Sequence, residues 1–507
     1  MVFFKFNLAR NTKMRRFNTR GVVAMEADED KNEEVSETTA PASVDAAEAE
    51  AAVVDSAVEG DENDESIEEA KDVSETLEVA AESLRIAAAN GGIDKYSARA
   101  IGALTQHLYN RVGLKARAMP ALESFGGTST RIGATQLALE GIKSGVREIW
   151  KSIIAAIKRM VAWIKGHFLK AFGGAEKMVK RANAIKDAAD AVSGKKQKEK
   201  SFENREIVKK LYIGNSVTPD TVASGLVVID TLIKDILGTK ASAMIDGGKK
   251  LIEAIENPTG MAAYTIPADS NKPTTASVSG SDKYGVSSDD MPVFTTGELL
   301  GGTVYAVRTN KASLTGDAAI QAFGEFKAKF VSKADSKVPS SEKVNTLTIN
   351  QIDNIASKVI SIGEELISFR STAIKLDKLL EEATKAAESA AKNEDNEVAT
   401  ESRREGRSRG RRNISTEDTP PEGGTGSTGT GSTGTGSTGS TGTGSTGGEK
   451  SDRDKEVEIK SHGALIRKAI SNLPKYIVTA FASATTYPLT TGQAALSYCE
   501  KSLSNYE

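Results

Sequence analysis

A periodic run of apolar residues in the second hundred positions limits this chain most strongly to a helical fold. Apolar side chains recur there at steps of three or four, which places them on one face of an α-helix. The series comprises Ile142, Val146, Ile149, Trp150, Ile153, Ile157, Met160, Val161, Ile164 and Phe168. We therefore predict a long amphipathic helix here, and we expect Gly173-Gly174 to end it.

Similar periodicity predicts helices before and after this one. One begins near residue 67 and ends at Gly91-Gly92, and residues 95–112 form the next. Shorter helices are expected over 206–257, and another long helix over 350–392. The chain should therefore be mainly α.

One stretch departs from the helical pattern. Residues 294–300 and 303–309 fit two strands joined by a glycine turn at Gly301-Gly302, which predicts a hairpin. The expected fold class is a mainly α, elongated helical bundle with a small α+β insert near 294–309 and long disordered segments.

Composition divides the chain into seven expected segments. These are a basic then acidic disordered leader (1–66), a helical segment (67–123), a helical core (124–257), an irregular region with a small α+β element (258–349), a long helix (350–392), a flexible linker (393–455) and a C-terminal helical element (456–507). The linker contains a Gly/Ser/Thr near-repeat, which cannot bury a core and behaves as a tether.

Charge is unevenly distributed along the chain. Residues 1–123 carry 14 Lys/Arg and 24 Asp/Glu, a net charge of −10, whereas the remaining residues carry 52 and 45, a net charge of +7. The acidic and basic parts are therefore separate blocks, and the basic block favours contact with a polyanion.

Residue types that carry catalysis or hold metals are rare. The three histidines, His107, His167 and His462, lie far apart in the sequence, and Cys499 is the only cysteine. No GxSxG, HExxH, CxxC or phosphate-loop motif occurs. We therefore predict that the chain is not an enzyme, and we expect no cofactor, no metal and no transmembrane span.

The 141–172 helix is basic beside its apolar stripe. Its notable side chains are Lys143, Arg147, Trp150, Lys151, Lys158, Arg159, Trp163 and Lys165. One interpretation is an interfacial helix for anionic lipid, or a surface for nucleic acid. We favour the simpler one, a core helix whose charges face water, because surface helices commonly have this composition.

A second basic cluster lies in the linker. It comprises Arg403, Arg404, Arg407, Arg409, Arg411 and Arg412. These arginines could contact phosphates, and only Glu405 interrupts them. No aromatic residue alternates with them to stack bases, so a solvated linker explains the cluster equally well.

Three short sequences resemble the sites cut by phage prohead proteases, which prefer a small or apolar residue two positions before a glutamate. Ala121-Leu122-Glu123 precedes Ser124, Ala24-Met25-Glu26 precedes Ala27, and Ala138-Leu139-Glu140 precedes Gly141. Chance matches such as Ala254-Ile255-Glu256 are also expected among 69 acidic residues.

The order of segments adds to this resemblance. An acidic, partly helical leader ends at a loop with an Ala-Leu-Glu site, and the tryptophan-containing basic helix follows. This order resembles the internal head and virion structural proteins of large (jumbo) tailed bacteriophages. The resemblance implies a structural protein inside the phage head, present in the host cytoplasm during assembly. It also implies a precursor whose helical propeptide, 67–123, is cut off by the prohead protease, with other head or core proteins and packaged DNA as partners.

Two other functions stay open. In the first, the chain is a membrane-active or ejected virion protein that uses the 141–172 helix at a membrane interface. In the second, it is an organellar or cytosolic helical scaffold, since residues 1–25 are basic and free of acid, as in a transit peptide. The acidic block that follows residues 1–25 does not fit an organellar protein.

Overall fold

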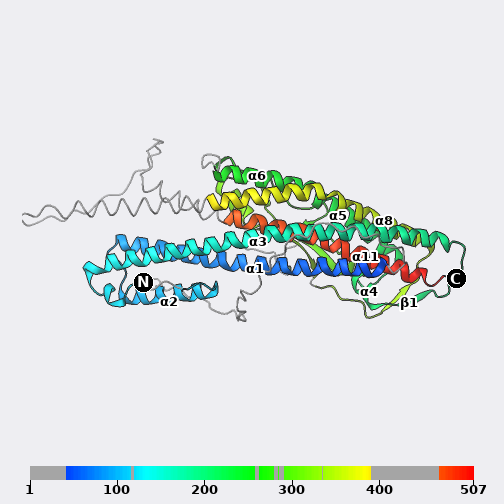
Figure 1. The fold of residues 1–507 in the computed structure, drawn as a ribbon, viewed down its shortest axis with the longest axis horizontal. Coiled ribbons are helices and arrows are strands. Elements are labelled where there is room, and N and C mark those ends of the chain that lie inside the picture. Colours follow the sequence, from blue (N-terminus) through cyan, green and yellow to red (C-terminus); the bar gives the residue numbers. More distant parts are fainter. Residues whose placement is uncertain are drawn as a thin grey trace, which may run out of the picture. The chain divides into compact units, whose positions relative to one another are not determined.

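The computed structural model describes residues 42–115, 119–256, 262–278, 284, 291–333, 335–389 and 468–506. Among these, two compact units can be recognised. Unit 1 is built from Asp72–Ile149, and unit 2 from Ser43–Lys71 together with the described residues from Trp150 onward. Helices α1 (Ala42–Ala89) and α3 (Thr128–Ala191) each contribute to both units (Figure 1).

Unit 1 contains the last part of α1, α2 (Lys95–Arg111), the 3₁₀ turn η1 (Leu122–Phe125) and the first part of α3. The predicted stop after α1 is confirmed, because Gly91 and Gly92 have φ of 97° and 81°, a conformation that favours glycine. The Asp94 side chain then caps α2 by accepting a hydrogen bond from the Ser97 backbone N–H at 2.7 Å.

Some helices of unit 2 have clear sequence signals at their starts. Capping boxes at Thr218 and Thr348 begin α5 and α8. The helical elements are α4 (Arg205–Leu211), α5 (Pro219–Ile233), the π-helix η2 (Lys234–Lys240), α6 (Ala241–Glu256), α7 (Gly316–Phe323), α8 (Ile349–Ser368), helical residues 370–389 and 468–477, the π-helix η6 (Val478–Ala482) and α11 (Ser483–Leu503).

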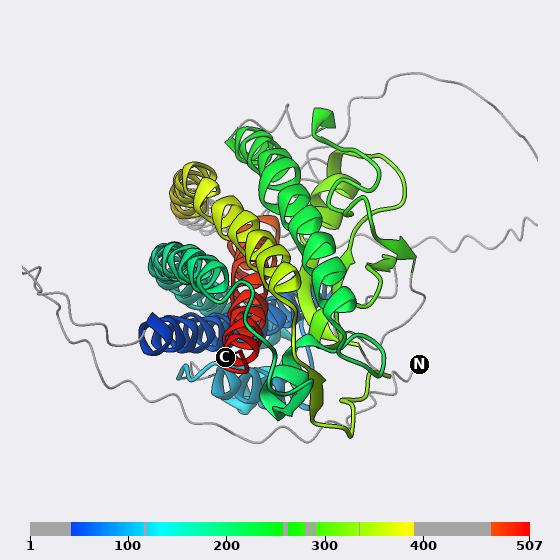
Figure 2. The same ribbon diagram turned by 90° about the vertical axis from the view of Figure 1, so that its right-hand side faces the viewer.

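Short antiparallel strands complete unit 2, and Figure 2 shows them gathered on one side of its helices. A four-stranded sheet has the order β3 (Ser277–Val278), β4 (Val293–Thr295), β5 (Thr303–Arg308) and β7 (Lys327–Ser332). Two smaller pairs join β1 (Ser201–Glu203) to β8 (Lys343–Asn345) and β2 (Thr265–Ile266) to β6 (Leu314–Thr315).

The predicted hairpin corresponds to β4 and β5, where Phe294 pairs with Val307. A 3₁₀ turn, η5 (Leu300–Gly302), joins the strands, and Gly301 and Gly302 have φ of 71° and 63°. The first strand is shorter than predicted and ends at Thr295. The prediction of a mainly helical protein with a small β-containing insert is confirmed.

Two local predictions are wrong. Helix α1 begins at Ala42, inside the leader expected to be disordered, because this segment is rich in alanine and buries Val53 completely. Gly173-Gly174 does not end α3, which continues to Ala191. Just beyond the glycines, Met178 packs so closely on α11 that a Cβ at Gly492 would lie 2.5 Å from its sulfur, so helix packing outweighs the low helix propensity of glycine.

Candidate processing site and the contacts across it

The first candidate cleavage site lies in an exposed turn of unit 1. Glu123 and Ser124 are in η1, between α2 and α3, and the Glu123 side chain points to solvent. The Ser124 N–H donates to the Ala121 carbonyl at 2.9 Å, and the Gly126 N–H donates to the Glu123 carbonyl at 3.1 Å. Phe125, 1% exposed, fixes the far end of the turn. Short exposed turns of this kind are preferred sites of proteolysis.

The other two candidates differ in their surroundings. Glu140 has an exposed side chain, but it lies inside the continuous helix α3, so its backbone would have to unwind before a protease could bind it. Glu26 and Ala27 lie outside the described residues. Of the two described candidates, the geometry therefore favours the bond between Glu123 and Ser124.

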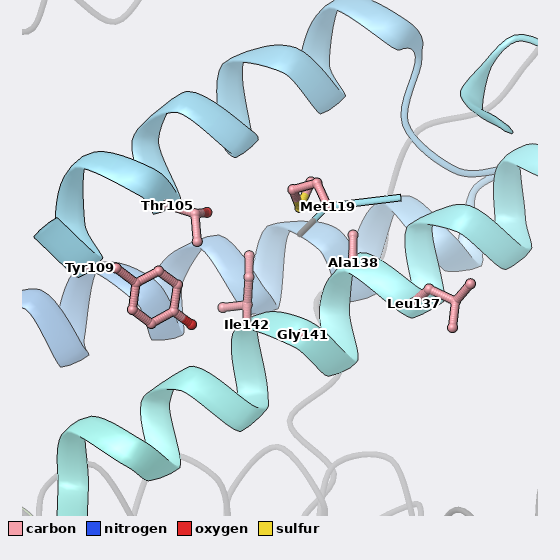
Figure 3. Close-up of a pocket in the computed structure, with 7 residues that line it drawn as sticks. All are labelled: Thr105, Tyr109, Met119, Leu137, Ala138, Gly141 and Ile142. Atoms are coloured by element: carbon pink, nitrogen blue, oxygen red, sulfur yellow. The ribbon is translucent and has the colours of Figure 1, made fainter. Parts of the chain in front are cut away.

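Residues before this bond pack against residues after it within unit 1. Figure 3 shows Thr105 and Tyr109 of α2, together with Met119, facing Ala138, Gly141 and Ile142 of α3 around a cavity of about 10 Å³. That volume is near the minimum for a single water molecule, so the two sides are closely packed. The buried hydroxyl of Thr135 also accepts a hydrogen bond from the Ile93 backbone N–H at 3.0 Å.

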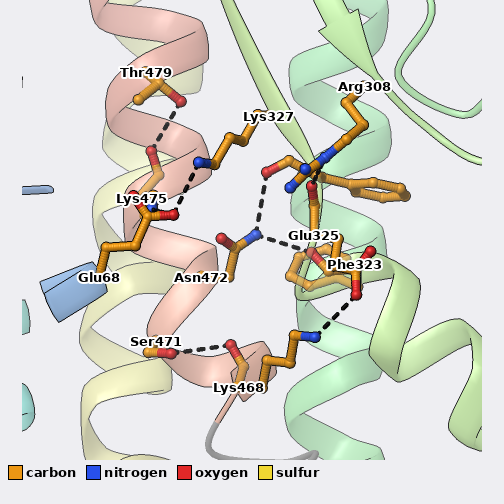
Figure 4. A network of polar contacts seen from close by, with 11 residues as sticks. Glu68, Arg308, Phe323, Glu325, Lys327, Lys468, Ser471, Asn472, Lys475 and Thr479 are labelled. Atoms are coloured by element: carbon orange, nitrogen blue, oxygen red, sulfur yellow. Dashed lines mark hydrogen bonds and ion pairs between the residues drawn. The ribbon is translucent and has the colours of Figure 1, made fainter. Parts of the chain in front are cut away.

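A second set of contacts lies in unit 2, where Glu68 of α1 meets two lysines (Figure 4). Its Oε1 accepts from the Nζ of Lys327 at 2.9 Å and lies 3.0 Å from the Nζ of Lys475. Burial raises the pKa of Glu68, but the two ammonium groups outweigh it and lower the pKa to about 2. The Lys475 side chain is only 6% exposed, so Glu68 balances a buried positive charge.

Beside Glu68, further polar contacts connect the helix at 468–477 to the α7–β7 turn. Lys468 forms an ion pair with Glu325 at 2.9 Å, and the Asn472 amide donates to the Phe323 carbonyl at 2.9 Å (Figure 4). These contacts fix the element that carries Lys475.

The basic amphipathic helix is part of the core. Trp150 and Trp163 are 3% and 8% exposed, so its apolar face is covered. Lys158 pairs with Glu388 at 2.5 Å, and Lys165 pairs with Asp377 and Glu381 on the helix at 370–389. The hydrogen bonds that Lys165 donates to Glu381 and Asp377 raise its pKa. These contacts support the core-helix interpretation.

The other predicted basic residues are distributed differently. Lys151 and Arg159 are exposed, and Lys143 and Arg147 are half-buried. The arginine cluster at 403–412 lies outside the described residues.

Sequence analysis missed two buried polar residues on α3. Arg181 donates from Nε and Nη2 to both carboxylate oxygens of Glu500, at 2.8 and 2.6 Å. His167 is 1% exposed, stacks on Trp163 with 5.0 Å between ring centroids, and lies 3.2 Å from the Thr485 hydroxyl. Both residues lie among the regularly spaced apolar residues of α3, and this position is the sequence signal that could have predicted their burial.

A basic loop after α3 also has a defined geometry. Lys195, Lys196 and Lys200 are exposed, while the loop backbone is held on both sides. The Lys198 N–H donates to the Asn505 carbonyl at 2.8 Å, and the Thr346 N–H donates to the Lys200 carbonyl at 2.9 Å. The loop therefore presents several ammonium groups from a fixed backbone.

No described helix has the combined length and apolarity needed to cross a membrane. In the same part of the chain, no group of three or more His, Cys, Asp or Glu side chains is arranged to hold a metal ion.

Comparison with known proteins gives one family. The family of phiKZ-like phage internal head proteins matches residues 39–411, which is well over half of the chain. Neither the curated proteins nor the solved structures contain a match. The matched range includes α1, the η1 turn and α3. By this match, the chain belongs to the phiKZ-like phage internal head proteins.

Proposed function

We propose that this structural protein of the phage head interior is made as a precursor and is cut between Glu123 and Ser124 by the prohead protease. Hydrolysis of that bond adds one water, leaving a carboxylate on Glu123 and a new amino terminus on Ser124. During assembly the precursor would be in the host cytoplasm with other head or core proteins. The observation that carries the proposal is the exposed η1 turn, which presents an Ala-Leu-Glu sequence outside any long helix.

Substitution at the two described sites should separate them. We expect Glu123→Gln to abolish cutting of the bond before Ser124 by the prohead protease, because the protease is expected to recognise the carboxylate before the scissile bond. Glu140→Gln, the matched control inside α3, should be cut as fast as the parent chain. Mass spectrometry of the products would measure both. Cutting of Glu123→Gln at an unchanged rate would contradict this site.

DNA association is the second part of the proposal, and charge supports it. Once residues 1–123 have left, the remaining residues carry a net charge of +7. The loop with Lys195, Lys196 and Lys200 holds exposed ammonium groups on a fixed backbone, which suits contact with phosphates. The linker arginines 403–412 would add sequence-independent attraction.

Salt dependence should reveal the contribution of this loop. In the cut chain from which residues 1–123 have been separated, the triple variant Lys195→Gln, Lys196→Gln, Lys200→Gln should lower the magnitude of the slope of log affinity against log salt by roughly 3, about one for each lost phosphate contact. Duplex DNA binding at several salt concentrations gives the slope. The control replaces three exposed lysines of α3, Lys170, Lys177 and Lys180, by glutamine. Equal slopes for the two triple variants would argue against a specific role of the loop.

A membrane-active or ejected role has less support. It requires the apolar face of the 141–172 helix to enter a lipid interface. In this fold Trp150 and Trp163 are buried, and Lys158 and Lys165 are paired with carboxylates. The helix would have to leave its unit before it could bind lipid.

A further inference from the structure

We infer that cutting between Glu123 and Ser124 does not by itself release the propeptide, because residues before the cut remain docked on residues after it in each unit. The inference rests on the proposed cleavage site. Cleavage and release are then two separate steps. After cleavage, the part of the chain that begins at Ser124 still binds helix α1 of the 1–123 fragment.

In unit 1 the docking surface is the first part of α3. Tyr109, which is 1% exposed, packs so closely on α3 that a Cβ added at Gly145 would overlap the tyrosine hydroxyl. The backbone of Gly92 is equally close to α3, since a Cβ there would lie 2.8 Å from the Arg131 carbonyl carbon. The hydrogen bond from Ile93 to Thr135 also crosses the cut. None of these contacts depends on the peptide bond after Glu123.

In unit 2 the retained element is residues 43–71 of α1. This segment is one helix, which cannot bury its own side chains, yet Val53 and Ile67 are 0% and 1% exposed. Residues after the cut must therefore cover them. Glu68 adds a charged contact, because its partners Lys327 and Lys475 both lie after the cut. Removing the helix would leave the buried Lys475 ammonium without this carboxylate.

Retention changes the order of events during maturation. As long as residues 1–123 stay bound, their net charge of −10 stays beside the +7 of the remainder. The change to a basic particle would then follow release of the helix rather than cleavage. A second cut within the propeptide, or local unfolding of α1, could provide that release.

An engineered cut tests retention independently of the natural protease. A recognition sequence for an unrelated site-specific protease is inserted between Glu123 and Ser124 of the full chain, and the purified protein is cut to completion. We expect the two fragments to co-elute in size-exclusion chromatography under native conditions and to separate in denaturant. Elution of the 1–123 fragment on its own in native buffer would overturn the inference. Failure of the prohead protease to cut this turn would instead count only against the proposed function.

Two matched pairs of variants identify the contacts that hold the fragment. Gly145→Ala should raise the rate of fragment dissociation roughly tenfold by forcing Tyr109 out of its place. Gly133→Ala, on the same part of α3, where an added Cβ meets nothing within 4 Å, should leave the rate unchanged. Likewise, Glu68→Gln should speed dissociation, whereas Glu75→Gln, at an exposed position of α1, should not.

The uncut variants are checked first by thermal unfolding, so that a folding defect is not read as fragment release. With folded proteins, equal dissociation of Gly145→Ala and Gly133→Ala would show that the α2–α3 contact does not hold the fragment. Equal dissociation rates for Glu68→Gln and Glu75→Gln would show that the contact of Glu68 with the two lysines does not hold the fragment. If both pairs behaved equally, the assigned surface would be wrong.

Discussion

Replacing Arg181 with alanine is expected to lower the free energy of unfolding of unit 2 by about 3 kcal/mol. The Arg181 side chain is 7% exposed and donates to Glu500, to the Gln493 amide oxygen at 2.6 Å and to the Ser497 hydroxyl at 3.1 Å. All three partners are on α11, so this one guanidinium ties the C-terminal helix to α3. Alanine leaves these groups without their donor, and such losses are costly in a buried setting. Urea unfolding of the full chain measures the change.

A surface pair on the same helix provides the control. Lys186 lies 3.2 Å from Asp353 and donates to the Ser357 hydroxyl at 2.9 Å, but its side chain and that of Asp353 are 34% and 55% exposed. Water screens such a pair, so Lys186→Ala should cost less than about 1 kcal/mol. A cost of Arg181→Ala no larger than that of Lys186→Ala would mean that α11 is held mainly by its apolar contacts.

The free energy of unfolding is also expected to fall by about 3 kcal/mol as the pH is lowered from 6.5 to 4. Burial lowers the pKa of His167 from 6.5 to about 4. Between these values the unfolded chain binds a proton on this imidazole and the folded chain does not, so acid favours unfolding. Above pH 6.5 both states are neutral at His167 and its contribution is fully present.

Glu68 extends the acid sensitivity to lower pH. Its pKa is about 2 in the folded chain and about 4.5 when unfolded, so the unfolded chain binds the extra proton between these values. Half of its side chain is exposed and therefore screened, and we expect about 1 kcal/mol from it. Its contribution is present above pH 4.5 and is lost as the pH falls to 2.

Urea unfolding at a series of pH values tests both groups. His167→Gln should flatten the profile between pH 4 and 6.5, and Glu68→Gln should flatten it below 4.5. His107→Gln, at an exposed position of α2, should leave the profile as it is in the parent chain. A parent chain whose stability does not change between pH 4 and 6.5 would contradict the assignment to His167.

The sequence was most informative where a pattern is local. The three- and four-residue spacing from Ile142 to Phe168 predicted a helix whose apolar face proved to be core, and Gly91-Gly92 marked the end of α1. The same reasoning failed at Gly173-Gly174, because Met178, just beyond them, packs on Gly492 of a helix more than three hundred positions away. Local propensity alone cannot report such packing.

At the candidate site, too, local features could be predicted from the sequence and long-range contacts could not. The Ala-Leu-Glu sequence and its loop setting could be read directly from residues 116–130. The contacts that cross the cut could not, because Glu68 meets Lys327 from a distance of 259 positions and Ile93 meets Thr135 from 42. Sequence periodicity does not connect residues that are so far apart. A charged residue that pairs with a buried residue of opposite charge therefore cannot be distinguished from an ordinary surface residue by sequence alone.

The intact mass and the N-terminal peptide of the protein from purified phage particles test the central claim most directly. We predict a chain that starts at Ser124, with the fragment that ends at Glu123 as the matching product in assembling heads. A chain in the particle that starts at Met1, or at any position other than Ser124, would contradict processing at the η1 turn.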